Sequence, residues 1–142
     1  MKPSLYLAAT VLSLALTGLL SQARAQSNPS SQSKADTKIV HADPVEAKKL
    51  VSEKKVEVVD VRTPKEYEGG HIAGAKNIDF QAADFEKKLA ELDRGKTYLV
   101  HCAAGGRSTK SLESFKKLQF KSVVHLDGGL RVWEKAGNPV EK

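Results

Sequence analysis

The chain has 142 residues and a formal net charge of +6, from 23 lysines and arginines against 17 aspartates and glutamates. The basic residues are scattered in pairs among glutamates and are not gathered in one block with aromatic side chains, which is typical of solvated helix faces and argues against a nucleic-acid surface. The single cysteine excludes an internal disulfide, so one modest apolar core must hold the fold.

Residues 1–25 have the pattern of an export signal. Lys2 gives a positive start, residues 5–20 are uncharged and mostly apolar, and residues 23–25 (Ala-Arg-Ala) place small side chains around one variable position, as signal peptidase requires. The apolar run is shorter than the roughly 20 residues of a membrane-spanning helix, so cleavage after Ala25 is favoured over a retained anchor. We therefore expect a periplasmic or secreted protein with no stable membrane insertion after cleavage.

Residues 26–36 are expected to be a disordered leader, because they are rich in Ser, Gln and Asn and leave almost nothing apolar to bury. The folded domain is then expected over residues 37–142. It has no internal repeat and alternates short β-branched runs with amphipathic stretches. This pattern predicts an α/β domain in which helices cover a parallel sheet.

In the first half of the domain, the N-cap residue Asp43 and the proline after it predict a helix over residues 44–54. Residues 56–61 form a nearly continuous apolar run, which suits a buried strand. A threonine and a proline begin a helical turn at residues 64–69, which two glycines end. Residues 76–79 can form a brief strand.

In the second half, apolar side chains at helical spacing predict a helix over residues 85–92, and residues 97–101 indicate a compact strand. A helix should then run from two glycines to about residue 119. A strand at residues 123–126 and a final helix around Trp133 complete the domain. In open parallel sheets the ligand site lies beyond the C-terminal ends of the strands, where the single cysteine falls.

The segment from Cys102 to Ser108 joins a predicted strand to a predicted helix. Its backbone N–H groups can form an anion-binding nest, the helix dipole favours negative charge on the sulfur, and its glycines allow tight curvature. These effects favour a nucleophilic thiolate over an inert buried thiol, and Arg107 adds a fixed cation. We therefore predict Cys102 as the catalytic residue. The predicted substrate-binding residues are Ala103, Ala104, Gly105, Gly106, Arg107 and Ser108.

Three segments resemble motifs of the rhodanese family. The first is Cys102 followed by glycines and Arg107, with four residues between the cysteine and the arginine. The second is residues 58–78, with Val-Val-Asp-Val-Arg and then Gly-His-Ile-Ala-Gly-Ala; the third is residues 127–139, with Asp-Gly-Gly, a tryptophan, a glycine and a proline. The resemblance covers residues 39–139 and implies an open parallel sheet of about five strands with helices on both faces.

The resemblance also implies a function. Cys102 would take a sulfane sulfur from thiosulfate or a similar small anion, hold it as a persulfide, and pass it to cyanide, a thiol or a protein acceptor, with no cofactor. Asp60 and Arg62 would brace the site loop from the neighbouring strand end. Ala103 and Ala104 stand where some family members carry basic or polar side chains, so the donor stays open.

Other interpretations stay open beside this one. His71, His101 or His125 could pair with Cys102 as a Cys–His dyad, although an amide nest and a helix dipole can activate a thiol without a base, and the family motif makes His71 a packing residue. A metal site is not expected, because no second cysteine or closely spaced histidine pair is present. A phosphatase or arsenate reductase on the same fold uses a loop one residue longer. A persulfide carrier or a non-catalytic binding domain would keep the same fold.

Overall fold

The structure is a computed structural model that describes residues 36–142. The predicted signal sequence, residues 1–25, and all but the last residue of the predicted leader lie outside the described residues. In the described part of the chain, no helix is long and apolar enough to span a bilayer.

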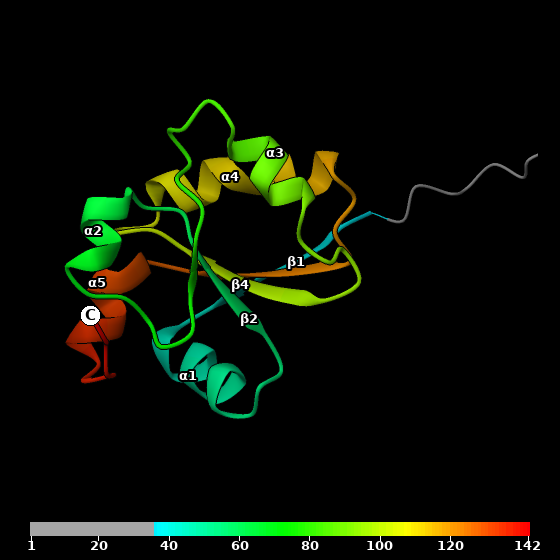
Figure 1. Ribbon diagram of the computed structural model, residues 1–142. Helices are drawn as coiled ribbons and strands as arrows, with labels where there is room; N and C mark the ends of the chain where they lie inside the picture. The colour runs from blue at the N-terminus through cyan, green and yellow to red at the C-terminus, as the bar shows by residue number, and fades with distance from the viewer. Residues whose placement is uncertain (1–35) are drawn as a thin grey trace, which may run out of the picture. The chain divides into compact units, whose positions relative to one another are not determined.

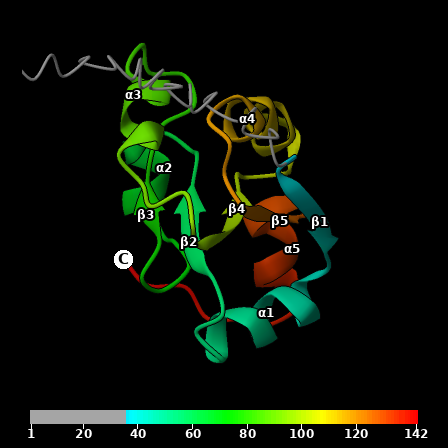
Figure 2. The same ribbon diagram turned by 90° about the vertical axis from the view of Figure 1, so that its right-hand side faces the viewer.

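A five-stranded sheet forms the centre of the domain, and every neighbouring pair of strands is parallel. In their order across the sheet the strands are β1 (Lys38–Ala42), β5 (Ser122–Leu126), β4 (Thr97–His101), β2 (Glu57–Asp60) and β3 (Lys76–Asn77). Figure 2 shows the strands side by side with β1 and β3 at the two edges. The predicted open parallel sheet is therefore confirmed.

Helices cover both faces of the sheet. They are α1 (Pro44–Ser52), α2 (Pro64–Glu68), α3 (Phe85–Ala90), α4 (Gly106–Lys117) and α5 (Gly129–Lys135). Helices α3 and α4 lie on one face, and α1 and α5 lie on the other (Figure 1). Each helix predicted from the sequence is present, although α3 ends two residues earlier than the spacing of its apolar residues suggested.

Two apolar clusters, one on each face, hold the helices to the sheet. Neighbouring residues of a strand point to opposite faces, so Val58 packs with α1 and α5 while Val59 packs with α3 and α4. The large aromatic residues Phe115 and Phe120 are fully buried in the α3–α4 cluster. Because the sheet is buried on both faces, its central strands are nearly continuous apolar runs, which is the pattern that the sequence shows.

Hydrogen-bonded caps begin the first two helices where the sequence predicts them. The Asp43 carboxylate accepts the N–H groups of Val45 and Glu46 at 2.8 and 2.9 Å. In a capping box the side chain three residues after the cap also accepts the backbone N–H of the cap residue in return, and both α1 and α2 begin with one. At the start of α2 the box is formed by Thr63 and Glu66. The second box has a consequence for the site, because it holds the Glu66 carboxylate at the end of the sheet where the cysteine lies.

Candidate active site

Cys102 directly follows the central strand β4, and its side chain is buried, with 2 % of its surface exposed. The loop after it ends at Gly105, whose φ of 101° is the left-handed conformation that glycine adopts without strain, and α4 begins at Gly106. The structure thus places the predicted nucleophile between a strand end and the N-terminus of a twelve-residue helix.

The sulfur of Cys102 accepts hydrogen bonds from its own loop and from the first turn of α4. The N–H of Gly105 donates to Sγ at 3.1 Å, and Oγ of Ser108 lies 3.5 Å from the same atom. Burial raises the pKa of the Cys102 thiol, but the Ser108 hydroxyl and the amides of Ser108, Ala104 and Gly105 outweigh it, so the pKa lies below that of an ordinary cysteine. The loop therefore stabilises the thiolate, the nucleophilic form of the residue.

Backbone hydrogen bonds from the start of α5 hold the cysteine loop in place. The N–H of Leu130 donates to the carbonyl oxygen of Cys102 at 2.8 Å, and the N–H of Arg131 donates to that of Ala103 at 3.0 Å. This approach requires glycine at position 129, because a Cβ there would lie 2.4 Å from the Cys102 carbonyl oxygen. The second glycine of the motif Asp-Gly-Gly is therefore needed so that the start of α5 can approach the cysteine loop, which the sequence motif alone did not reveal.

The side chain of Arg107 binds Glu66 and makes no hydrogen bond to the sulfur of Cys102 within the described residues. Its guanidinium donates from Nη1 to Oε2 and from Nη2 to Oε1, both at 2.7 Å. The bidentate contact with Arg107 lowers the pKa of Glu66 to about 2, against the opposing effect of burial. In the sequence, Glu66 stood out only as part of the segment 58–78 that resembles the family motif, and nothing there paired it with Arg107. Donor binding by Arg107 stays a prediction, and such binding has to compete with this carboxylate.

Replacing Glu66 with glutamine is expected to remove a contribution to stability that depends on pH. The folded-state pKa of about 2 lies below the 4.5 of an unperturbed glutamate, so the contribution is present above pH 4.5 and is lost as the pH falls towards 2. We expect a difference of about 0.5–1 kcal/mol at neutral pH, since the pair is partly exposed and screened by solvent. The free energies of unfolding of wild type and Glu66→Gln should converge between pH 4.5 and 2; a constant difference over this range would contradict the pairing.

Asp60 and Arg62 form a buried ion pair next to β4. Nη2 of Arg62 lies 2.6 Å from Oδ2 of Asp60 and also donates to the carbonyl oxygen of Gly70 at 2.7 Å. The N–H of Val61 donates to the carbonyl oxygen of His101, the residue before the cysteine, at 3.0 Å. The pair therefore joins the end of β2 to the segment before β3. Bracing of the cysteine loop by these two side chains stays a prediction.

Among the residues that the structure describes, no histidine hydrogen-bonds the sulfur of Cys102. His71 stacks on Tyr67 with the ring centroids 3.8 Å apart. His101 is fully buried, and burial lowers its pKa. His125 reaches the cysteine only through Ser108, whose Oγ lies 2.8 Å from Nε2 of the ring. A direct Cys–His dyad is therefore absent from the described site, and His125 is connected to Cys102 only through the Ser108 hydroxyl.

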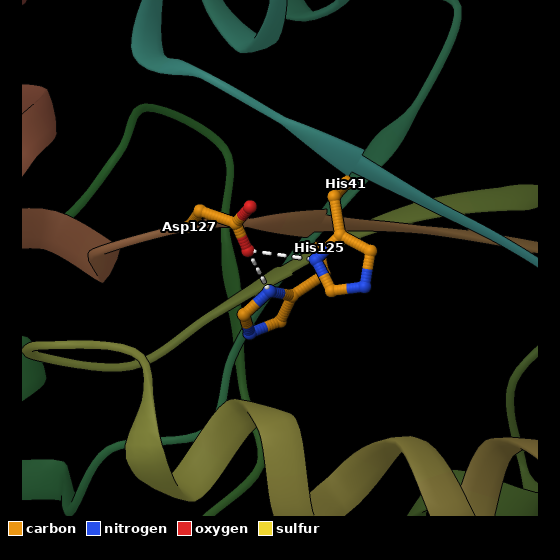
Figure 3. Close-up of side chains that lie close together, drawn as sticks. All are labelled: His41, His125 and Asp127. Atoms are coloured by element: carbon orange, nitrogen blue, oxygen red, sulfur yellow. Dashed lines mark hydrogen bonds and ion pairs between the residues drawn. The ribbon is translucent and has the colours of Figure 1, made fainter.

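His41, His125 and Asp127 come together at the ends of β1 and β5, with their polar atoms within 4.8 Å of one another. Figure 3 shows both rings directed at one oxygen of Asp127, and the distances from Oδ1 to the two Nδ1 atoms are 2.8 and 2.7 Å. A carboxylate only accepts, so each Nδ1 carries a hydrogen. The sequence argument on histidine spacing did not foresee this group. His41, His125 and Asp127 therefore form a hydrogen-bonded group in which both histidines donate to the same carboxylate oxygen.

The fold and the site define an α/β domain with a buried cysteine of lowered pKa at the C-terminal edge of a parallel sheet. A model of the family described as "Rhodanese-like domain" matches residues 43–136. The chain belongs to this family, as the sequence motifs predicted.

Two curated relatives and one solved structure show how far the likeness extends. "Probable adenylyltransferase/sulfurtransferase MoeZ" of Mycobacterium tuberculosis is 37% identical over 90 residues, which are 63% of this chain and 23% of that protein. "Thiosulfate sulfurtransferase GlpE" of Pseudomonas aeruginosa is 35% identical over 91 residues, which are 63% of this chain and 79% of that protein. The crystal structure of a rhodanese-related protein from Thermoplasma volcanium has a TM-score of 0.65 and 31% identity, covering 72% of this chain and 97% of that chain.

Proposed function

We propose that the protein is a sulfurtransferase in which Cys102 carries the transferred sulfur as a persulfide. The observation that carries this proposal is the loop around Cys102, where backbone amides and a hydroxyl converge on one sulfur atom and lower its pKa. The relatives named as sulfurtransferases support the same reaction class.

In the proposed reaction the Cys102 thiolate attacks the outer sulfur of thiosulfate. A bond forms between the two sulfur atoms, the bond between the outer sulfur and the sulfonate sulfur breaks, and sulfite leaves with the bonding electron pair. Cys102 then holds a persulfide anion, which occupies the positive end of the amide nest. Cyanide or a thiolate next attacks the outer sulfur and restores the Cys102 thiolate, so charge and electrons balance in both steps.

The length of the loop favours sulfur transfer over phosphate chemistry. Four residues separate Cys102 from Arg107, and the amides of Ala104, Gly105 and Ser108 meet at the sulfur itself. A loop that wraps a tetrahedral phosphate or arsenate must spread its amides around four oxygen atoms. The charge of Arg107 is also paired with Glu66, which leaves less positive potential for a multiply charged oxyanion.

The proposal is tested by mass spectrometry of the purified protein after incubation with thiosulfate. The intact mass should rise by one sulfur atom, and cyanide should then remove that atom as thiocyanate. Mercaptopyruvate and a small persulfide serve as alternative donors in parallel reactions, because Ala103 and Ala104 leave the donor open. Absence of an adduct with every donor, or efficient hydrolysis of an aryl phosphate, would overturn the assignment.

A persulfide carrier would form the same Cys102 persulfide as an enzyme. Measuring turnover with small acceptors distinguishes the two functions. If Cys102 passes its sulfur only to a protein acceptor, the adduct should form at a normal rate while cyanide and small thiols remove it slowly. Multiple turnovers with small acceptors would instead establish an enzyme that acts on small molecules. The exposed rim of the loop, formed by Ala104 and Gly106, leaves room for either kind of acceptor.

We also propose that the protein is exported and cleaved after Ala25. The support is the pattern of residues 1–25 alone, with its positive start, its apolar run and its small residues at the cleavage site. N-terminal sequencing of protein recovered from the producing cell should begin at Gln26. Recovery of a membrane-bound form that still begins at Met1 would contradict the proposal.

A further inference from the structure

A chain of polar contacts runs from the sulfur of Cys102 to the surface. Ser108 on α4 lies 3.5 Å from Sγ of Cys102, and 2.8 Å separate its Oγ from Nε2 of His125 on β5. Nδ1 of His125 lies 2.7 Å from Oδ1 of Asp127. Ser108 and His125 are buried, so water does not compete for these contacts, whereas the Asp127 side chain is 57% exposed.

The positions of the hydrogens along this chain follow from the acceptor at its outer end. The Asp127 carboxylate has no hydrogen to give, because its contacts with His41 and His125 lower its pKa. The contact with His41 is the larger of the two effects, and burial opposes both. Nδ1 of His125 therefore carries a hydrogen, and the neutral ring offers a lone pair at Nε2. The Ser108 hydroxyl can donate to that lone pair and accept from the Cys102 thiol, although the carbonyl oxygen of Gly105, 3.0 Å from Oγ, is a second acceptor for its hydrogen.

We infer that His125 accepts the proton of the Cys102 thiol through Ser108, and that Asp127 orients and stabilises the resulting imidazolium. The S–H bond of Cys102 breaks as its proton moves to Oγ of Ser108, and the former hydroxyl proton of Ser108 moves to Nε2 of His125. The products are a thiolate and an imidazolium, so the net charge is unchanged. The inference rests on the proposed function for the use of the thiolate, and His125 acts as a positioning residue that touches no substrate.

The surroundings of His125 support this role. In the described part of the chain the His125 ring contacts two titratable groups, His41 on β1 and Asp127 after β5, and it reaches Cys102 only through Ser108. The His41 ring meets the His125 ring edge to face, with centroids 5.3 Å apart, and binds the same carboxylate oxygen. On the α4 side, Oγ1 of Thr109 lies 3.4 Å from Nε2, and the hydroxyls of Thr109 and Ser108 both also donate to the carbonyl oxygen of Gly105.

The test measures thiolate formation directly, by the rate at which iodoacetamide alkylates Cys102 as a function of pH. Cys102 is the only cysteine, so the readout is unambiguous. His125→Gln keeps a polar side chain but cannot accept a proton; alkylation near pH 7 should slow by about tenfold or more, and its pH midpoint should rise. Ser108→Ala should slow alkylation as well. The double variant should be no slower than Ser108→Ala, because both changes break one chain.

His41→Gln is the matched control. It makes the same change in a ring that binds the same oxygen of Asp127 but has no contact with Ser108, so its effect should be clearly smaller than that of His125→Gln. Because His125 is buried and its replacement can weaken the fold, Asp127→Asn provides a second variant at an exposed side chain, and it should shift the pH midpoint in the same direction. Thermal unfolding of each variant establishes that the protein is folded at the assay temperature.

The outcomes separate this inference from the proposed function, because alkylation needs no sulfur donor. A wild-type pH profile in His125→Gln, or effects of His125→Gln and Ser108→Ala that simply multiply, would overturn the relay. Persulfide formation at the wild-type rate and with the wild-type pH profile in His125→Gln would do the same and would leave sulfur transfer standing. A shifted alkylation profile in a protein that forms no persulfide would support the relay and refute the transfer reaction.

Discussion

Replacing Cys102 with serine is expected to abolish sulfur transfer and leave the fold intact. A serine hydroxyl is far less acidic than a thiol, so hydrogen bonds that lower the pKa of a thiol do not ionise it, and it cannot hold a sulfane sulfur in the same way. Loss of the nucleophile commonly costs an enzyme on the order of 10³-fold or more in turnover. We therefore expect thiocyanate formation to fall to the background rate, and no sulfur adduct in the intact mass after incubation with thiosulfate.

The fold should survive this change because oxygen replaces sulfur at nearly constant shape. The buried hydroxyl can accept the hydrogen bond that the N–H of Gly105 donates to Sγ in the wild type. Matching thermal midpoints for wild type and variant, measured under the assay conditions, would show that chemistry and not folding was lost. Sulfur transfer at the wild-type rate by Cys102→Ser would make the non-catalytic binding domain the better account of the protein.

Replacing Gly129 with alanine is expected to disrupt both the fold and the cysteine loop. An added Cβ would lie 2.4 Å from the carbonyl oxygen of Cys102 and 2.8 Å from the carbonyl carbon of Ala103, and both are backbone atoms that no side-chain rotation can move. The φ of 65° adds backbone strain. We expect a loss of about 2–4 kcal/mol in the free energy of unfolding, which lowers the melting midpoint by roughly 10–25 °C in a domain of this size.

Gly137→Ala is the matched control for this variant. Its φ of 75° imposes similar backbone strain, but an added Cβ there meets nothing within 4 Å. We expect it to cost about 1–2 kcal/mol and to leave sulfur transfer nearly unchanged. The Gly129 variant, assayed at a temperature where it is still folded, should lose sulfur transfer because the clash displaces the Cys102–Ala103 peptide. Equal effects of the two substitutions would show that the contact with the loop is unimportant.

Much of the fold could be predicted from the sequence because the signals for it are local. The cap at Asp43, the apolar run of β2 and the glycines at the start of α4 act within a few residues of their own positions, so they indicate where each element begins and ends. The edge strand β1 was not predicted as a strand. Its apolar pair Ile39-Val40 is short and is flanked by Lys38 and His41, and of its residues only Ala42 is buried, so the strand depends on pairing with β5.

For the site, the sequence by itself determined that Cys102 lies between a strand and a helix, since strand and loop are adjacent in the chain. Only the tertiary structure decided what surrounds it. Glu66 meets Arg107 across 41 positions, and His41 meets Asp127 across 86. Such contacts depend on which strands become neighbours in the sheet and which helix start packs on which loop, and no spacing within one segment encodes them. The physical reason is that periodicity records which face of an element is buried, whereas its partner is chosen by the packing of the whole domain.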